Sequence, residues 1–413
     1  MSAANENESG AQNPADSGAD TTKPTARQWL SVVSVALTAT VFCAAEFMPV
    51  GLLRYISDGL WVSEGTAGEM VTAPGILAAI AAPVLTVAVG RHDRRLVLWA
   101  LGALLAASSL IAMLAPNFPV LILGRVLFGI GLGGFWAIGA GVGGRLVPEK
   151  HVAKATSIIF AGVSIGMLVG GWAGALIGDL FGWRAAFGVT LVLSVVALGA
   201  QVMLLPSMKV ELSIRPSDLF GIVSTRKGKV GLLAMFFLLS GQFGTYTYVT
   251  PFLAKVSGFD GQTISSILLG YTLIGLLGNF VGGAAAGRNV KAALSAAILL
   301  FIVSVLLLPV LGSRQAVTLV LLAVWGVAYG AIPIALQVWM VKAAPDASEG
   351  AMALFVANFQ LSIAVGSFVG GLAVDGLGLL NAMTLGGAAA VLAIAILWAF
   401  GGSPVLQSQV DGG

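Results

Sequence analysis

Charged side chains are scarce in this 413-residue sequence, where Asp, Glu, Lys and Arg together make up 9% of the residues. Soluble domains carry about 25%, so the sequence cannot cover a water-facing surface of ordinary size, which excludes a typical soluble enzyme. The single cysteine, Cys43, excludes an internal disulfide and a cysteine-rich metal site. A net charge of +3, without a basic stripe, argues against a nucleic-acid partner. We therefore expect no metal, no organic cofactor and no nucleic acid.

Apolar residues and glycine dominate instead. Hydrophobic residues account for 58% of the chain and glycine for 55 residues, well above the average glycine share of about 7%. Lipid offers no partners for backbone polar groups, so an apolar run of about 20 residues is expected to cross a bilayer as a helix. The sequence predicts an all-α membrane protein with twelve transmembrane helices, in the runs 30–53, 66–89, 96–115, 118–143, 155–178, 184–205, 230–254, 263–286, 292–311, 316–341, 350–374 and 379–400.

The polar segments divide the chain and orient it. Residues 1–28 have the composition of a disordered tail, residues 206–228 form a linker between the bundles 29–205 and 229–401, and residues 402–413 form a second tail. With the first tail inside the cell, sixteen of the 21 Lys and Arg residues fall in the inner connections and four in the outer ones. By the positive-inside rule, both tails and the linker are expected to be cytoplasmic. We expect the protein itself to lie in the inner membrane of a bacterium.

Four short landmarks recur in the second half of the chain at an offset of 196 or 197 residues. In order, they pair Ala45-Glu46-Phe47 with Gly241-Gln242-Phe243, Gly90-Arg91 with Gly287-Arg288, Gly133 with Gly330, and Asp179 and Gly182 with Asp375 and Gly378. The repeat predicts two six-helix halves in parallel orientation. Halves of this kind with a site between them, near the middle of the membrane, are typical of transporters.

Glu46 and Arg125 are the charges deepest inside apolar runs. At 1.5 Å per residue, both lie about 10–12 Å below the outer membrane face, so they can meet if the first and fourth helices are neighbours. An ionisable residue inside a membrane is a functional candidate because its burial is costly. A carboxyl beside a cation in apolar surroundings can bind a proton in one conformation and release it in another. The alternative is a purely structural ion pair.

Several aromatic and amide side chains lie in the interiors of runs and form a candidate substrate site. Such groups on facing helices suit a planar polar ligand, which they stack on and hydrogen-bond. Tryptophan and tyrosine also anchor helices at membrane interfaces, but interior positions do not fit that role. The candidates are Trp136, Gln242, Tyr246, Trp325, Tyr329 and Asn358.

Glycine recurs every four residues along the fifth run, in the order Gly162, Gly166, Gly170, Gly174 and Gly178. Small residues at this spacing allow close helix packing, and we expect such stripes to let the two halves slide or rock against each other. Asp179 and Asp375, at the outer ends of two runs, are expected to cap helices or form turns.

Three motifs resemble those of the major facilitator superfamily over residues 29–400. Leu121 to Gly134 resembles the arginine motif of its fourth helix, which is implicated in proton transfer. The glycines Gly162, Gly166, Gly170 and Gly171 resemble the antiporter motif of its fifth helix. The loop residues Arg91, Asp93, Arg94 and Arg95 occupy the place of its gating motif, with Gly90 where aspartate is usual.

The resemblance is to the twelve-helix drug:proton antiporter branch, and Ala45-Glu46-Phe47-Met48-Pro49 resembles the first helix of its nucleoside and sugar exporters. It implies a monomeric transporter, not an enzyme, that works by alternating access. Glu46 would carry the proton with Arg125 as its partner, and the six aromatic and amide candidates would contact the substrate. The expected activity is export of small polar compounds, purine ribonucleosides first, in exchange for protons. The alternative is a sugar or multidrug exporter of the same family.

Overall fold

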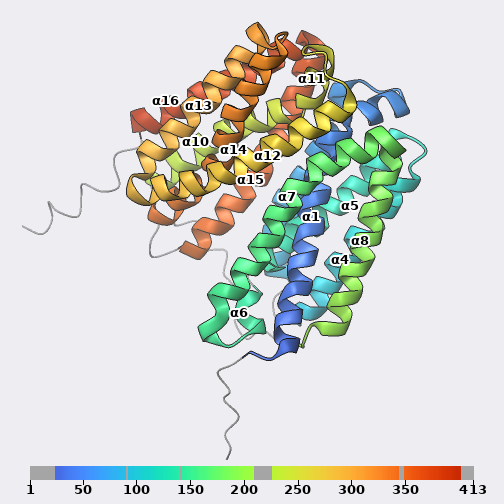
Figure 1. Cartoon of the computed structure of the whole chain (residues 1–413). Helices are drawn as coiled ribbons and strands as arrows, with labels where there is room; N and C mark the ends of the chain where they lie inside the picture. Colours follow the sequence, from blue (N-terminus) through green and yellow to red (C-terminus); the bar gives the residue numbers. More distant parts are fainter. Residues whose placement is uncertain (1–23, 90–91, 140–141, 209–225, 344–347, 401–413) are drawn as a thin grey trace, which may run out of the picture.

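The computed structural model of the chain describes residues 24–89, 92–139, 142–208, 226–343 and 348–400, and these form two groups of helices (Figure 1). The first group, the N-terminal half, contains α1 (Ala26–Leu60), α2 (Glu64–Ala67), α3 (Glu69–Val89), α4 (Arg94–Leu114), α5 (Phe118–Ile138), α6 (Gly143–Leu146), the 3-10 helix η2 (Glu149–His151), α7 (Val152–Phe181) and α8 (Trp183–Leu204). The second group, the C-terminal half, contains α10 (Arg226–Tyr246), α11 (Val249–Lys255), α12 (Gly261–Arg288), α13 (Val290–Leu311), α14 (Gln315–Ala343), α15 (Ser348–Leu377) and α16 (Leu379–Phe400).

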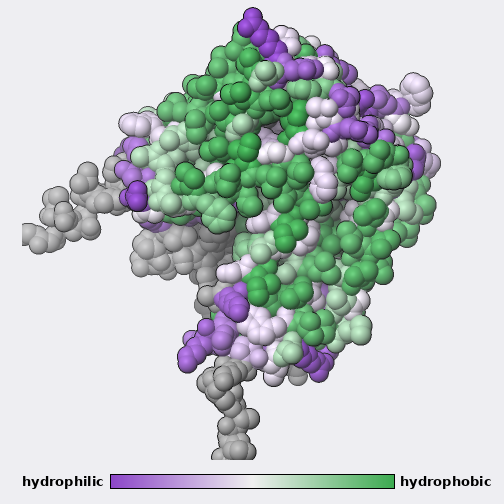
Figure 2. All heavy atoms as spheres, in the orientation of Figure 1, coloured by the Kyte–Doolittle hydropathy of each residue, from purple (hydrophilic) through white to green (hydrophobic). Residues whose placement is uncertain are grey.

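The helices have the length and surface of membrane spans. Within the described ranges, 11 helices are long and apolar enough to cross a membrane, and α10 with α11, bent by 41°, makes a twelfth span. Apolar side chains cover the flanks of the molecule and polar ones gather toward its ends (Figure 2). Large side chains such as Leu277 and Phe280 are 64% and 70% exposed, as expected where lipid is the solvent. The predicted all-helical membrane fold is confirmed.

The first helix begins earlier than predicted. It starts at Ala26 because Thr25 and Gln28 form a capping box, in which each side chain bonds the other's backbone N–H. The boundary expected after residue 28 is therefore too late. The predicted linker and C-terminal tail fall largely on residues 209–225 and 401–413, which lie outside the described ranges.

Glycine sets the distance between neighbouring helices in both halves. At each contact below, a Cβ on the glycine would run into a backbone carbonyl oxygen of the facing helix, so a larger residue would force the helices apart. The contacts repeat at offsets of 196 and 197 residues in both partners: Gly170 against Ala44 and Gly366 against Ser240, then Gly133 against Ala78 and Gly330 against Gly275. The sequence repeat is thus a repeat of helix contacts.

The glycine stripe of α7 packs within its own half. Its members face α1, where Gly162 lies on the carbonyl of Ala36 and Gly166 on that of Thr40. The contact between the halves is made instead by α3 with α15 and by another face of α7 with α12. The stripe therefore fixes α7 to α1, and the expectation that it forms a sliding surface between the halves is not met.

Polar contacts join the halves at the end that carries the α1–α2 connection, called here the sealed end. The Asp375 carboxylate accepts hydrogen bonds from the Ser63 hydroxyl, at 2.5 Å, and from the Gly65 N–H, at 3.0 Å. Lys255 forms an ion pair with Glu64 at 3.0 Å. At the opposite end, where α1 begins, the surface is notched between the halves (Figure 2).

The repeat extends to this seal. Gly65 and Gly261 are 196 residues apart, as are Asp375 and Asp179, and Gly261 at the start of α12 lies against the Asp179 carboxylate as Gly65 lies against that of Asp375. Asp179 also accepts a hydrogen bond from Tyr55 at 2.9 Å. Both aspartates therefore reach the first turn of a helix in the other half, where a negative charge is favourable. The purely local role expected for them is incomplete.

We expect Asp375→Asn to loosen the sealed end, because it removes the negative charge that two donors of the other half share. The Asn side chain can still accept both bonds, and the charge of an exposed carboxylate contributes about 0.5–1 kcal/mol, so the population with separated halves should rise about two- to fivefold. Spin labels on Trp61 and Arg314, one exposed position in each half, would report this as a longer distance component. Asp58→Asn, an exposed carboxylate near the same end, is the control, and equal distance distributions in both variants would contradict the prediction.

Candidate functional site

Glu46 lies in α1 at the boundary between the halves and is 7% exposed. Its Oε1 accepts a hydrogen bond of 3.0 Å from Nε2 of Gln360, which belongs to α15 in the other half. Gln360 is 3% exposed, and its own Oε1 has no hydrogen-bond partner among the described residues. Gln360 was not predicted, because nothing distinguishes it in the sequence beyond its being an amide in an apolar run. The carboxyl predicted to carry the proton thus contacts both halves.

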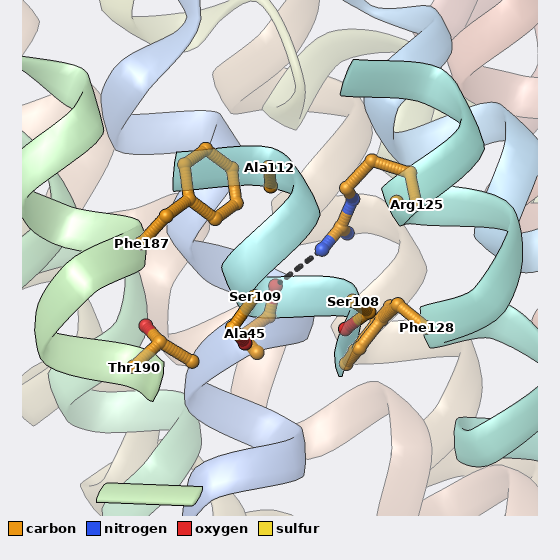
Figure 3. Close-up of a pocket in the computed structure, with 9 residues that line it drawn as sticks. Ala45, Ser108, Ser109, Ala112, Arg125, Phe128, Phe187 and Thr190 are labelled. Atoms are coloured by element: carbon orange, nitrogen blue, oxygen red, sulfur yellow. Dashed lines mark hydrogen bonds between the residues drawn. The ribbon is translucent and has the colours of Figure 1, made fainter. Parts of the chain in front are cut away.

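Arg125 extends from α5 toward the backbone of α1 (Figure 3). It is 2% exposed, and its guanidinium lies over the Phe128 ring at 4.3 Å. Nε donates to the carbonyl of Met70 at 2.9 Å and Nη1 to that of Ala45 at 3.1 Å. Arg125 therefore ties α5 to α3 and to the residue that precedes Glu46.

The direct ion pair expected between Glu46 and Arg125 is not formed, although both side chains are described. Backbone carbonyls take two of the guanidinium donors, while Gln360 holds the carboxyl. The two charges still interact through space. Arg125 thus acts on Glu46 through the α1 backbone and by its field.

Fig. 3 also shows a small space beside Arg125 that belongs to the N-terminal half alone. It is lined by side chains of α4 and α8, among them Ser108, Ser109 and Thr190. The Nη2 atom of Arg125 is buried and lacks a partner among the described residues. The hydroxyls of Ser108, Ser109 and Thr190 donate to carbonyls of their own helices.

A second, narrow space lies where the two halves face each other and is called here the central cavity; its volume is about 10 Å³ in this conformation. Two of the predicted substrate residues, Gln242 and Tyr329, line it. The other lining side chains are mostly apolar and come from α7, α10, α14 and α15: Met167, Leu239, Phe243, Ile332, Pro333 and Phe359. Phe359 of the lining directly precedes Gln360, whose side chain is bonded to Glu46, so the cavity lies beside the carboxyl.

An aromatic cluster supports the cavity wall. Tyr246 stacks on Tyr329 with ring centroids 5.5 Å apart and on Tyr271 at 5.4 Å. Trp325 is fully buried behind them and donates its indole N–H to Gln242 Oε1 at 2.9 Å. Trp325 therefore orients Gln242 and is not itself a free stacking surface in this conformation. Tyr271 was not among the predicted residues, because a single tyrosine in an apolar run does not show which face of its helix is turned toward the cavity.

Of the four predicted substrate residues that do not line the central cavity, Tyr246 and Trp325 belong to the aromatic cluster behind it, whereas Asn358 and Trp136 lie outside that cluster too. The Asn358 amide donates to the carbonyl of Leu232 at 2.9 Å and so joins α15 to α10. Trp136 is half-buried against Phe135, and its indole N–H has no partner among the described residues. Both are absent from the cavity lining, because the repeat of polar side chains along a run does not specify which face is turned inward.

The loop between α3 and α4 is bound to its own half. Asp93 caps α4, and its carboxylate accepts hydrogen bonds from Ser207 Oγ at 2.6 Å and from the Met208 N–H at 2.8 Å. Partial burial raises the pKa of Asp93, but these bonds outweigh it and hold the pKa below its usual value. Arg95 lies over the Trp99 ring at 5.0 Å. Arg94 shares the start of the helix, and Arg91 lies outside the described residues.

This arrangement places a protonatable group between the two halves and a narrow cavity lined by tyrosine, phenylalanine and amide groups beside it. Chemically, the carboxyl can bind and release a proton, and the aromatic and amide groups are of the kind that stack on and hydrogen-bond a planar compound, which would need a wider cavity than this conformation provides.

Comparisons with known proteins agree with this architecture. The family model described as Major Facilitator Superfamily matches residues 35–366 and 231–412. Purine ribonucleoside efflux pumps named NepI from Salmonella paratyphi B and Salmonella typhimurium are each 34% identical over 359 residues, which is 87% of this chain and 90% of theirs.

Solved structures share the fold at low sequence identity. A bacterial homologue of the human lysosomal transporter Spinster, in an inward-facing and occupied conformation, has a TM-score of 0.76 at 14% identity and covers 92% of this chain and 98% of its own. The nucleoside transporter NupG, as a D323A mutant, has a TM-score of 0.75 at 16% identity and covers 90% and 98%. With the matching family model and the 34% identical relatives, the chain belongs to the major facilitator superfamily, and it is a multi-pass membrane transporter.

Proposed function

We propose that this transporter is a proton-coupled antiporter that exports small polar compounds, purine ribonucleosides first among them, from the bacterial cytoplasm. The observation that carries the proposal is the position of Glu46, buried at the boundary of the halves and bonded across it by Gln360. When the halves separate, this carboxyl loses its amide partner and gains water. Its affinity for a proton therefore differs between the two arrangements, which is the requirement for coupling.

The substrate class is supported by the cavity and by the relatives. The relatives at 34% identity are purine ribonucleoside efflux pumps, and the central cavity offers the Tyr329 ring for stacking and the Gln242 amide beside it. A purine ribonucleoside is planar at one end and rich in hydrogen-bonding groups. A sugar has no aromatic face, so the tyrosine stack favours the nucleoside over the sugar alternative.

The proposed direction follows from the charge of the connections. With the basic connections in the cytoplasm, the sealed end is the outer one and both termini lie inside the cell. Export would then proceed from this outwardly closed state by binding of substrate, proton release from Glu46 and reorientation of the halves.

The first prediction concerns coupling. Glu46→Gln keeps the shape of the side chain but cannot exchange a proton. In proteoliposomes with an imposed proton gradient, the variant should bind radiolabelled adenosine or inosine yet fail to move it uphill. The exposed carboxylate Glu149 provides the control Glu149→Gln, which should transport like the wild type.

A purely structural role of the buried Glu46 charge, near Arg125 and bonded to Gln360, predicts a different outcome for the same variant, namely lower stability because a compensating buried charge is lost. Thermal unfolding of Glu46→Gln therefore has to accompany the transport assay. If the folded variant still drives uphill transport with normal dependence on the gradient, Glu46 is not the proton carrier.

The second prediction concerns the substrate. Tyr329→Leu removes the stacking face of the central cavity, which should weaken purine nucleoside binding about fivefold, as expected for a loss of about 1 kcal/mol. Trp398→Leu removes an aromatic ring that is 63% exposed on the outside of the C-terminal half and serves as the control. Binding of nucleosides, sugars and antibiotics is compared by isothermal titration. Tighter binding of a sugar or an antibiotic than of any nucleoside would favour the multidrug or sugar alternative.

The third prediction concerns orientation. Trp61, in the α1–α2 connection, is 94% exposed, and Lys150, between α6 and α7, is exposed at the opposite end. In a Cys43→Ala background, a cysteine at Trp61 should react with an impermeant maleimide on intact cells, and one at Lys150 should react only after lysis. The reverse pattern would place the sealed end inside the cell.

A further inference from the structure

We propose that Gln360 is the partner of the transported proton, so that protonation of Glu46 locks the two halves together at the sealed end. The inference rests on the proposed proton coupling at Glu46 and adds to it a residue, a bonding pattern and a conformational consequence. Gln360 is a positioning residue here, because it acts through Glu46.

The geometry assigns one bond and leaves one polar atom without a partner. Gln360 Nε2 donates to Glu46 Oε1 at 3.0 Å, and Gln360 Oε1 is buried with no partner among the described residues. A buried acceptor without a donor is costly. The side chain next to it is a carboxyl, which gains a donor only when it takes up a proton.

Protonated Glu46 completes the pair. Its O–H donates to Gln360 Oε1 while its carbonyl oxygen accepts from Gln360 Nε2, so a carboxylic acid and an amide form two bonds side by side. Ionised Glu46 accepts only, and Gln360 Oε1 stays unpaired. Because Glu46 belongs to α1 and Gln360 to α15, the second bond adds directly to the contact between the halves.

Other ionisable groups near Glu46 do not provide this bond. The other ionisable groups near it are Arg125 from α5, Tyr329 from α14 and Cys43 from α1, of which the tyrosine and the cysteine are uncharged near neutral pH. Arg125 donates to backbone carbonyls through Nε and Nη1, its Nη2 has no partner among the described residues, and Cys43 is one turn away on the same helix as Glu46. Gln360 is the group from the opposite half that is bonded to the carboxyl.

The chain contains a matched control for this arrangement. Gln201 in α8 is fully buried, donates through Nε2 to Thr38 at 2.8 Å, and also has an Oε1 without a partner among the described residues. Its partner is a hydroxyl of the same half, which does not titrate. Replacing Gln201 thus changes a similar buried amide but should leave any proton-dependent contact between the halves intact.

The test is the reactivity of a cysteine placed in the seal. Ala67 in α2 is fully buried in a cluster with Tyr248 and Ala373 of the other half, so Ala67→Cys in a Cys43→Ala background reports opening of the sealed end. Maleimide labelling of the purified full chain in detergent, corrected for the intrinsic thiol reactivity of a free cysteine, is followed from about pH 5.5 to about pH 7.5, where tyrosine stays neutral. We expect labelling to slow about fivefold toward the acidic limit, the factor for one added buried hydrogen bond.

Four variants decide the outcome. Gln360→Met, and Gln360→Asn as a second choice if the first folds poorly, should label faster and lose the pH dependence. Glu46→Gln, whose amide can pair with Gln360 at every pH, should label slowly throughout. Gln201→Met should keep the pH dependence of the parent protein. The proposal is overturned if a folded Gln360 variant retains that pH dependence, or if Glu46→Gln labels as fast as the parent at the alkaline limit.

This labelling needs neither substrate nor a membrane gradient, so it separates the inference from the proposed function. A normal pH response that depends on Gln360, together with absent proton-driven transport in proteoliposomes, would remove the antiport proposal and keep the lock. Normal proton-driven transport by Gln360→Met would keep the antiport proposal and remove the lock.

Discussion

Backbone contact between helices is the constraint on which the rest of this structure depends. In a bilayer there is no hydrophobic driving force between helices, so their association relies on close packing. Here glycines bring α7 onto α1 and α15 onto α10 until carbonyl oxygens fill the space of a missing side chain. Each half becomes a rigid unit through these contacts, and motion is left to the surfaces between the halves. The site is built on that division, because Glu46 and Gln360 lie on helices of different units.

The polar contacts at the sealed end follow the same sequence repeat. Asp375 and Asp179 occupy equivalent places and approach Gly65 and Gly261, which are equivalent to each other. The two aspartate contacts need not be equally strong, since Asp375 accepts two hydrogen bonds from the other half whereas Asp179 accepts one from Tyr55 of its own half. A carboxylate at a helix start is also exposed to ions and water, so this contact is weaker than its short distances suggest.

The fold was predictable from the sequence because its signals are physical requirements. A span needs an uninterrupted apolar run, and a close helix contact needs a small residue, so twelve runs and a repeated Gly133 and Gly330 carry the architecture directly. The hydrogen-bond partners of individual side chains were not predictable in this way. Counting residues along each helix correctly placed Glu46 and Arg125 at a similar depth in the membrane. Depth does not show which acceptors the guanidinium of Arg125 will bond, and in the structure it donates to the backbone carbonyls of Ala45 and Met70.

The same limit explains the mixed result for the cavity. Gln242 and Tyr329 were predicted because a polar side chain inside an apolar run is costly unless it has a bonding partner or a function. Both line the central cavity. Asn358 was predicted on the same ground, yet its amide donates a hydrogen bond to the carbonyl of Leu232 within the C-terminal half. Polar residues in a membrane bundle serve either packing or transport, and a hydrogen bond within one half does not decide between the two uses, since Gln242 lines the cavity although it bonds Trp325 of its own half. Gln360, two residues after Asn358, differs from both amides because its partner Glu46 belongs to the other half, so that this bond depends on how the two halves are placed.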